Sequence, residues 1–108
     1  MRLSREEILA LHRELVATPS VSGDEVAIVS LLSSFLQGHG ATVEHVGGSL
    51  VAWAGKAPVK GDVAGAPLVV MNTHVDTVPP SPGWTRAPHQ ASSAEGKVFG
   101  LGANDAKA

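Results

Sequence analysis

An apolar run that ends abruptly in polar residues constrains the fold of this chain more than any other feature. Residues Leu68 to Met71 read Leu-Val-Val-Met, and Asn-Thr-His-Val-Asp follows directly and ends at Asp76. An unbroken apolar run of this kind is typical of a strand buried on both faces, as in a parallel sheet covered by helices. The sequence therefore predicts a central strand over Leu68–His74.

The polar residues that end this strand indicate where chemistry could take place. Side chains alternate along a strand, so His74 and Asp76 are expected to point to the same side at the carboxyl edge, where α/β sheets usually hold ligands. One ring nitrogen of a histidine can bind a metal ion while a carboxylate accepts a hydrogen bond from the other. We predict this division of roles for His74 and Asp76. The alternative is a surface turn with a hydrogen-bonded pair, because a His-x-Asp sequence is common by chance.

Composition excludes several classes of protein. With 108 residues, 44% of them hydrophobic, the chain is expected to form at most one domain with a packed core. The net charge of −2 without a run of like charges argues against a nucleic-acid partner. The absence of cysteine excludes disulfides, thiolate metal sites and cysteine nucleophiles. The sequence contains no signal peptide or apolar segment of membrane-spanning length, which predicts a cytoplasmic protein without a membrane partner.

Two amphipathic helices are predicted in the first forty residues. Each begins with a capping box, in which a glutamate follows a serine three residues later: Ser4 with Glu7, and Ser22 with Glu25. The first helix is expected to run to about Ala17, before Thr18-Pro19, and the second to Gly38 or Gly40. Both have an apolar stripe, so each is expected to cover another element.

Shorter strands are expected around the central one. Ala41–Val46 and Ser49–Ala54 flank Gly47-Gly48, a pair typical of tight hairpins. Lys97–Phe99 is a further short strand, and residues 55–67, rich in Gly, Ala, Pro and Lys, predict an exposed loop. The order of these elements predicts an α/β fold with a mixed sheet.

A second candidate ligand follows the last expected strand. The two glycines of Gly100-Leu-Gly102 make the backbone flexible ahead of Asp105. The Asp105 carboxylate would come from the end of a strand that neighbours the central strand. One carboxylate can bridge two metal ions, and two ions about 3.5–4 Å apart that share a water give a nucleophile active at neutral pH. The last four residues resemble the first turn of a helix, which predicts that the chain is a fragment of something longer.

Several of these motifs occur together, and in the same order, in a known family. The segments 72–79 (Asn-Thr-His-Val-Asp-Thr-Val-Pro), 83–85 (Gly-Trp-Thr) and 96–107 (Gly-Lys-Val-Phe-Gly-Leu-Gly-Ala-Asn-Asp-Ala-Lys) resemble the M20 metallopeptidases. Within that family they are most similar to the branch of acetylornithine deacetylases and succinyl-diaminopimelate desuccinylases. The resemblance covers essentially the whole chain. It implies a three-layer α/β fold with a mixed sheet and covering helices, in which residues 1–108 form the N-terminal part of a zinc-peptidase-like catalytic domain.

The resemblance also implies a role for each candidate residue. His74 would bind one metal ion, Asp76 would be the catalytic carboxylate that clamps its imidazole, and Asp105 would bridge two divalent ions, Zn²⁺ or Co²⁺. A cis peptide bond is implied between Asp105 and Ala106. The family's Glu-Glu pair, with the general base and a ligand, its remaining ligands and its lid and dimerisation domain are absent from these 108 residues. Ala108 stands where the family usually has glycine.

The implied activity is metal-dependent hydrolysis of the N-acyl amide bond of an amino acid by a homodimeric, full-length parent. N-acetyl-L-ornithine, a substrate of arginine biosynthesis, is favoured by the resemblance, with succinyl-diaminopimelate or a dipeptide as alternatives. These 108 residues are expected to be inactive alone. A hypothesis of another class is a non-catalytic remnant or interaction module.

The remaining polar residues are given structural roles. The four other histidines are expected to be solvated rather than metal ligands: His12, His39, His45 and His89. The family often has an apolar aromatic residue where His89 stands, which favours packing over chemistry there. Ser20 and Ser22 lack the surroundings of a nucleophile elbow. Gly100-Leu-Gly102 lacks the third glycine of a dinucleotide fingerprint. Trp84 would either line a substrate cleft or pack.

Overall fold

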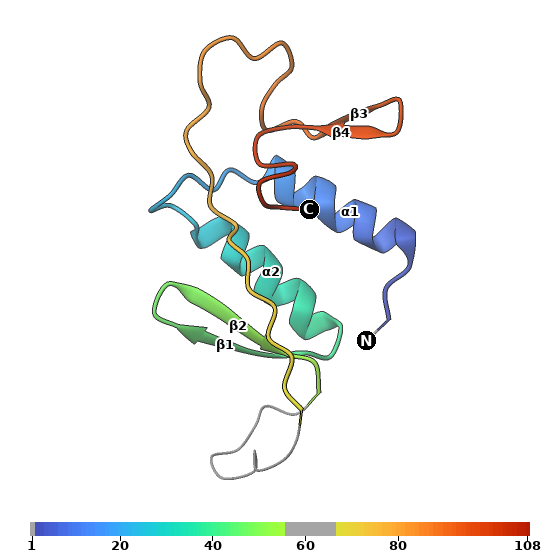
Figure 1. Ribbon diagram of the computed structural model, residues 1–108, viewed down its shortest axis with the longest axis vertical. Helices are drawn as coiled ribbons and strands as arrows, with labels where there is room; N and C mark the ends of the chain where they lie inside the picture. The colour runs from blue at the N-terminus through green and yellow to red at the C-terminus, as the bar shows by residue number, and fades with distance from the viewer. Residues whose placement is uncertain (1, 56–66) are drawn as a thin grey trace. The chain divides into compact units, whose positions relative to one another are not determined.

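The computed structural model describes residues 2–55 and 67–108, which form two helices and two small antiparallel sheets (Figure 1). The α/β class is therefore confirmed. The chain divides into two compact units. One comprises Leu32–Asn72, and the other comprises Arg2–Leu31 together with Thr73–Ala108. All three residues with predicted chemistry belong to the second unit.

Helix α1, Arg5–Ala17, begins with the predicted capping box. The Ser4 hydroxyl accepts a hydrogen bond from the Glu7 backbone N–H at 3.2 Å, and the Ser4 N–H donates to the Glu7 carboxylate at 2.7 Å. Thr18, in an extended conformation ahead of Pro19, ends the helix as expected. The capping residues therefore fix the start of α1, as the sequence predicts.

Replacing Ser4 by alanine should lower the free energy of unfolding by about 1 kcal/mol, because the first turn of α1 loses an acceptor for an N–H group. Ser34→Ala is the control, since Ser34 is exposed within helix α2, Val26–Gly38, where alanine is the better helix former. Urea unfolding of both variants measures the difference. Equal effects of the two substitutions would show that the capping box does not stabilise α1.

Helix α2 starts later than the sequence predicts. Its first hydrogen bond runs from the Val29 N–H to the Glu25 carbonyl at 3.0 Å. The Ser22 hydroxyl does not cap this helix, because it donates to the Asp76 carboxylate at 2.5 Å instead. The predicted capping box of Ser22 and Glu25 is therefore wrong, since a charged acceptor far along the chain competes for the serine. The end at Gly38 agrees with one of the two predicted positions.

The first unit contains the predicted hairpin. Strands β1, Thr42–Val46, and β2, Ser49–Trp53, are antiparallel, and Val46 pairs with Ser49. This register leaves Gly47-Gly48 as a two-residue turn, in which Gly47 has a φ of 59°. Glycine adopts such a left-handed conformation readily, so the Gly-Gly pair allows the tight turn.

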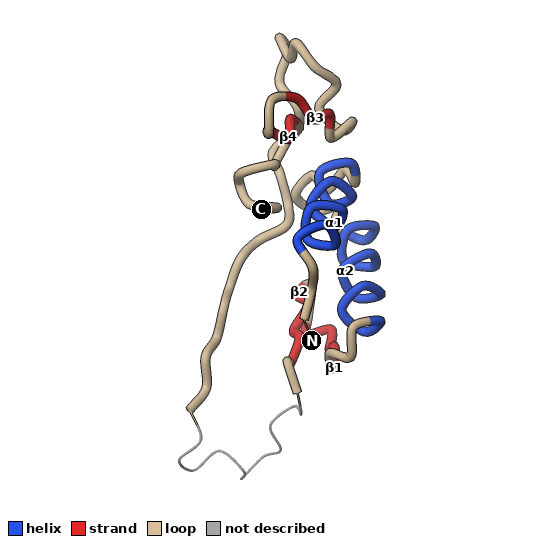
Figure 2. Tube along the Cα trace, turned by 90° about the vertical axis from the view of Figure 1, so that its right-hand side faces the viewer, coloured by secondary structure: helices blue, strands red, loops and turns tan. Residues whose placement is uncertain are grey.

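The predicted central strand over Leu68–His74 is not formed. Figure 2 shows residues 67–76 as loop, and they pair with no strand among the described residues. Four apolar side chains here are exposed by 58%, 85%, 76% and 93%: Leu68, Val69, Val70 and Met71. A strand needs a neighbour that satisfies its backbone N–H and C=O groups, and residues 2–55 and 67–108 provide none for this segment. The predicted three-layer mixed sheet is absent from the described part for the same reason.

The second unit contains a further hairpin of strands β3, Ser92–Ala94, and β4, Lys97–Phe99. Strand β4 is predicted by the sequence, whereas β3 is not, because Ser-Ser-Ala has little preference for a strand. The Arg13 side chain on α1 donates a hydrogen bond to the Ser93 hydroxyl at 3.1 Å, which links the hairpin to the helix.

The chain after β4 forms turns over residues 101–106 rather than the start of a helix. These turns are held against α1 by close packing at Gly100. A Cβ atom at Gly100 would overlap the Cγ1 atom of Val16, which is fully buried with Ile28 in the small core of this unit. The Leu101 N–H donates to the Pro88 carbonyl at 2.8 Å. Gly100 therefore sets where the turn that carries Asp105 begins.

Most of the predicted exposed loop, residues 56–66, lies outside the described residues. In the part of the chain that is described, no helix has the length and apolar character needed to cross a bilayer.

Candidate metal centre

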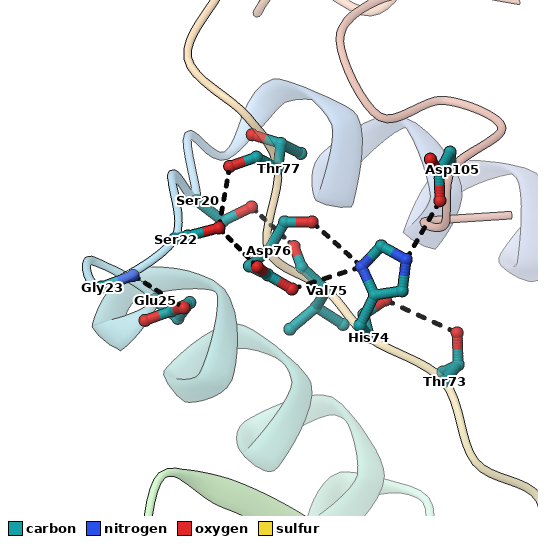
Figure 3. Close-up of polar contacts among 10 residues, drawn as sticks. All are labelled: Ser20, Ser22, Gly23, Glu25, Thr73, His74, Val75, Asp76, Thr77 and Asp105. Carbon is teal, nitrogen blue, oxygen red and sulfur yellow. Dashed lines mark hydrogen bonds and ion pairs between the residues drawn. The ribbon is translucent and has the colours of Figure 1, made fainter.

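The three predicted site residues lie together in the second unit (Figure 3). His74 and Asp76 lie on the extended segment that follows the apolar run, and Asp105 lies in the turn after β4. The His74 Nε2 atom is 3.0 Å from Asp105 Oδ1, and its Nδ1 atom is 3.2 Å from Asp76 Oδ1. Nδ1 is also 3.1 Å from the Asp76 backbone oxygen. The imidazole is therefore held between two carboxylates.

The turn that carries Asp105 is closed by the backbone and by a glycine. The Lys107 N–H donates to the Gly102 carbonyl at 3.0 Å, and the peptide bond between Asp105 and Ala106 is cis, as the resemblance implies. Gly102 has a φ of 79°, and a Cβ atom there would lie 2.8 Å from the Thr77 methyl group. A side chain at position 102 would therefore displace the turn from the segment that carries His74.

A buried lysine connects the same turn to the end of α1. The Lys107 side chain donates a hydrogen bond to the Thr18 carbonyl at 3.0 Å, and Lys107 is only 4% exposed. Burial lowers the pKa of Lys107, because the charged ammonium loses its hydration. The position of Asp105 is thus fixed by residues on both sides of its turn.

Two of the four other histidines, His12 and His39, are less solvated than expected. His12, which is half-buried, lies with its Nε2 atom 2.9 Å from the Ala103 carbonyl. His39 is half-buried against the Phe35 ring, with the centroids 4.2 Å apart. His89 is half-buried, in agreement with the packing favoured for it. Only His45 among the four is exposed, as predicted. The expectation is wrong for His12 because its partner, the Ala103 carbonyl, lies 91 residues away, and for His39 because it packs on Phe35 four residues earlier.

The distances at the site are compatible with two ligands of one metal ion. Two atoms bound to a tetrahedral zinc at about 2.0–2.1 Å lie roughly 3.3 Å apart, and Nε2 of His74 is 3.0 Å from Oδ1 of Asp105. The Asp76 contact with Nδ1 matches the carboxylate that commonly orients a metal-binding histidine. Within residues 2–55 and 67–108 no group of three or more His, Asp or Glu side chains could hold a metal ion. His74 and Asp105 thus offer only part of a ligand set.

Space for a ligand exists beside these residues. A hollow of about 430 Å³ is lined by His74, Asp76 and residues 100–105, and also by Thr77. Thr77 is 6% exposed, and its hydroxyl oxygen has no hydrogen-bond partner among the residues that the structure describes. A buried hydroxyl without a partner is costly, so this part of the hollow favours a polar occupant.

The hydrogen bonds of the site shift two pKa values in opposite directions. The pKa of His74 is raised, first by the hydrogen bond to the Asp76 backbone and then by the Asp105 carboxylate. Both ring nitrogens face acceptors, and only the imidazolium can donate to both. The pKa of Asp76 is lowered, mainly because the Ser22 hydroxyl donates to its carboxylate.

Similarity to curated proteins extends over nearly the whole chain. Succinyl-diaminopimelate desuccinylase from Xylella fastidiosa is 34% identical over 105 residues, which are 94% of this chain and 26% of that protein. The Bordetella pertussis protein of the same name is 35% identical over 109 residues, or 97% of this chain and 27% of that protein. A probable carboxypeptidase from Emericella nidulans is 35% identical over 110 residues, or 92% of this chain and 23% of that protein.

The resemblance to the M20 family is confirmed. The chain spans about a quarter of the length of the curated relatives that it matches. No family model matches the sequence. No solved structure matches it either.

One residue of the M20-like site is missed by the sequence reasoning. Ser22 contacts the Asp76 carboxylate, although its spacing from Glu25 predicts a helix cap. No signal in the sequence distinguishes these partners, because both roles use the same hydroxyl and Asp76 is 54 residues away. Trp84 is 40% exposed and is not among the residues that line the hollow. Its suggested place in a substrate cleft stays a prediction.

The shifted pKa of His74 predicts a measurable titration in the metal-free protein. The charged form of His74 is favoured in the fold, so its stabilising contribution is present below the ordinary pKa of 6.5 and is lost as the pH rises through the raised value. The lowered pKa of Asp76 has the opposite effect on stability: its stabilising contribution is lost as the pH falls through the lowered pKa. An NMR titration should therefore give His74 a midpoint above 6.5.

Asp105→Asn provides the matched variant for this titration. In this variant the titration midpoint of His74 should be lower than in the wild type, yet stay above 6.5. The hydrogen bond to the Asp76 backbone, which is the larger cause of the raised pKa, remains. A wild-type midpoint at or below 6.5 would contradict the observed contacts of the ring.

Proposed function

We propose that the protein containing this chain hydrolyses the N-acyl amide bond of an amino acid with two divalent metal ions, Zn²⁺ or Co²⁺. The observation that carries the proposal is the His74 imidazole held between Asp76 and Asp105 beside a hollow. The relatives named as a desuccinylase and a probable carboxypeptidase support hydrolysis as the reaction class.

Each residue has a separate role in this proposal. His74 would offer its Nε2 lone pair after losing the proton that faces Asp105, and Asp105 would offer its carboxylate oxygens. Asp76 would accept the Nδ1 proton and so keep the ring in the binding orientation. When bound, the metal ions supply Lewis acidity to water and to the scissile carbonyl. The resemblance assigns the general base to a Glu-Glu pair that follows the Asp105 motif in the family, and no glutamate follows Asp105 in these 108 residues.

Two substrates are candidates. The motifs favour N-acetyl-L-ornithine, whereas two of the relatives above are named succinyl-diaminopimelate desuccinylases. We propose N-succinyl-diaminopimelate as the first substrate to test, because that name accompanies similarity over 94–97% of this chain. We also propose a homodimeric cytoplasmic enzyme in which Leu68–Met71 becomes a strand of a three-layer sheet.

An assay of the natural protein tests this function. The protein is purified from its source cells, its intact mass is measured, and release of succinate or acetate is followed with Zn²⁺ or Co²⁺ present. We expect succinate release that stops on chelation and in a His74→Ala variant, and none from the 108-residue chain alone. Turnover that survives chelation and His74→Ala would refute the metal-dependent mechanism.

The same assay tests the non-catalytic alternative. A native mass near 11.0 kDa together with no turnover and no bound metal would favour a remnant or interaction module. Clear turnover by the 108-residue chain would instead show that its site is complete.

A further inference from the structure

We propose that Ser22 is a positioning residue for the metal site, because its hydroxyl fixes the carboxylate that orients His74. The inference deepens the proposed function and rests on it for the role of His74. Figure 3 shows the sequence of contacts from Ser22 through Asp76 and His74 to Asp105.

The two oxygens of the Asp76 carboxylate have different partners. Oδ2 accepts a hydrogen bond from the Ser22 hydroxyl at 2.5 Å, while Oδ1 lies 3.2 Å from Nδ1 of His74. A short hydrogen bond from a hydroxyl to a carboxylate is charge-assisted and strongly directional. Rotation of the carboxylate would lengthen both contacts. Ser22 therefore restricts the plane in which Asp76 can hold the imidazole.

The backbone of Ser22 is itself fixed beside the site segment. The Ser22 N–H donates to the Thr77 carbonyl at 3.0 Å, and the Thr77 N–H donates to the Ser20 carbonyl at 2.8 Å. Val21 forms a parallel β-bridge with Thr77, and the fully buried Ser20 donates its hydroxyl to the Val75 carbonyl at 2.7 Å. These backbone contacts place the Ser22 hydroxyl within reach of Asp76, and the hydroxyl itself adds a longer contact of 3.3 Å to the Thr77 carbonyl.

This arrangement separates positioning from folding. The Ser22 hydroxyl also lies 3.3 Å from the Thr77 carbonyl, but that carbonyl already accepts the Ser22 N–H, and the Val21–Thr77 bridge and the Thr77 N–H do not use the hydroxyl. Both the Ser22 and Asp76 side chains are solvent-accessible, Asp76 by 37%. An exposed hydrogen bond contributes little to stability. Loss of this hydroxyl should therefore alter the orientation of Asp76 and His74 more than it alters the fold.

Substitutions of matched shape test this role. Ser22→Thr keeps the hydroxyl, Ser22→Val has the shape of that threonine with a methyl group in place of the hydroxyl, and Ser22→Ala removes the hydroxyl. Ser93→Ala is the control, since it deletes another side-chain hydrogen bond of the same unit, the one with Arg13. Each variant is titrated with Zn²⁺, its Co²⁺ absorption spectrum is recorded, and the ring ¹⁵N shifts of His74 are measured without metal at one pH.

We expect Ser22→Val and Ser22→Ala to bind Zn²⁺ about 10-fold more weakly, as loss of an outer-shell partner typically does. Their Co²⁺ spectra and His74 ring shifts should change, whereas Ser22→Thr and Ser93→Ala should match the wild type. Equal affinities and ring shifts for Ser22→Thr and Ser22→Val would overturn the inference. Absence of Zn²⁺ binding by the full-length wild-type protein would refute the metal-binding function, and the metal-free ring shifts would still decide the role of Ser22.

Discussion

His74→Ala should abolish zinc binding by this chain, whereas His45→Ala should leave the affinity unchanged. Nε2 of His74 lies 3.0 Å from Oδ1 of Asp105, the other proposed metal ligand. Alanine at position 74 leaves Asp105 as a single carboxylate, which cannot hold Zn²⁺ in water at useful affinity. His45 is an exposed histidine on β1, so its removal controls for weak binding by any surface imidazole.

Isothermal titration at high protein concentration measures this effect, because two protein ligands bind a metal weakly. Asp105→Asn should weaken binding by roughly 10–100-fold, at least as much as loss of an outer-shell partner. Far-UV circular dichroism of each variant confirms that the helices persist. Zinc binding that is lost in His45→Ala, or retained in full by His74→Ala, would place the metal elsewhere.

Gly100→Ala should lower the free energy of unfolding by about 3 kcal/mol, which is the upper end of the range for overpacking a core. It should be among the most destabilising additions of a single methyl group to this chain. The added Cβ would overlap Cγ1 of Val16 and would lie 3.1 Å from the Pro88 backbone oxygen, which cannot move aside easily. Gly48→Ala is the control, because no described heavy atom lies within 4 Å of a Cβ there. Its effect should stay within about 0.5 kcal/mol.

A double variant shows whether the overlap with Val16 is the cause. In a Val16→Ala background the Cγ1 atom is absent, so Gly100→Ala should cost less than it does alone, and the two effects should not add. Chemical unfolding of the four proteins of this cycle measures the coupling. Additive effects would mean that Gly100 is required for a reason other than its contact with α1.

Local signals in the sequence predict much of the secondary structure. The capping box of Ser4 and the turn at Gly47-Gly48 depend only on residues three or fewer positions apart, and both form as expected. The His-x-Asp pair and Asp105 are also brought together as their motifs suggest. Their role as metal ligands stays a prediction, because contact between side chains does not demonstrate binding.

Features that depend on residues far apart in the sequence are predicted less accurately than these local ones. The apolar pattern of Leu68–Met71 indicates a buried strand, yet burial requires partners that the described residues do not provide. Ser22 has the spacing of a helix cap, and a carboxylate at position 76 competes for the same hydroxyl. In both cases the sequence specifies a local preference, and a contact far along the chain, or its absence, decides the outcome.

The most direct test of the central claim is anomalous diffraction at the zinc edge from crystals of the zinc-loaded protein. We predict a peak about 2.0–2.1 Å from Nε2 of His74, with a carboxylate oxygen of Asp105 as a second ligand. Asp76 should remain within hydrogen-bonding distance of Nδ1. A peak at other residues, or zinc-saturated crystals in which Nε2 still contacts Asp105 directly, would contradict the account.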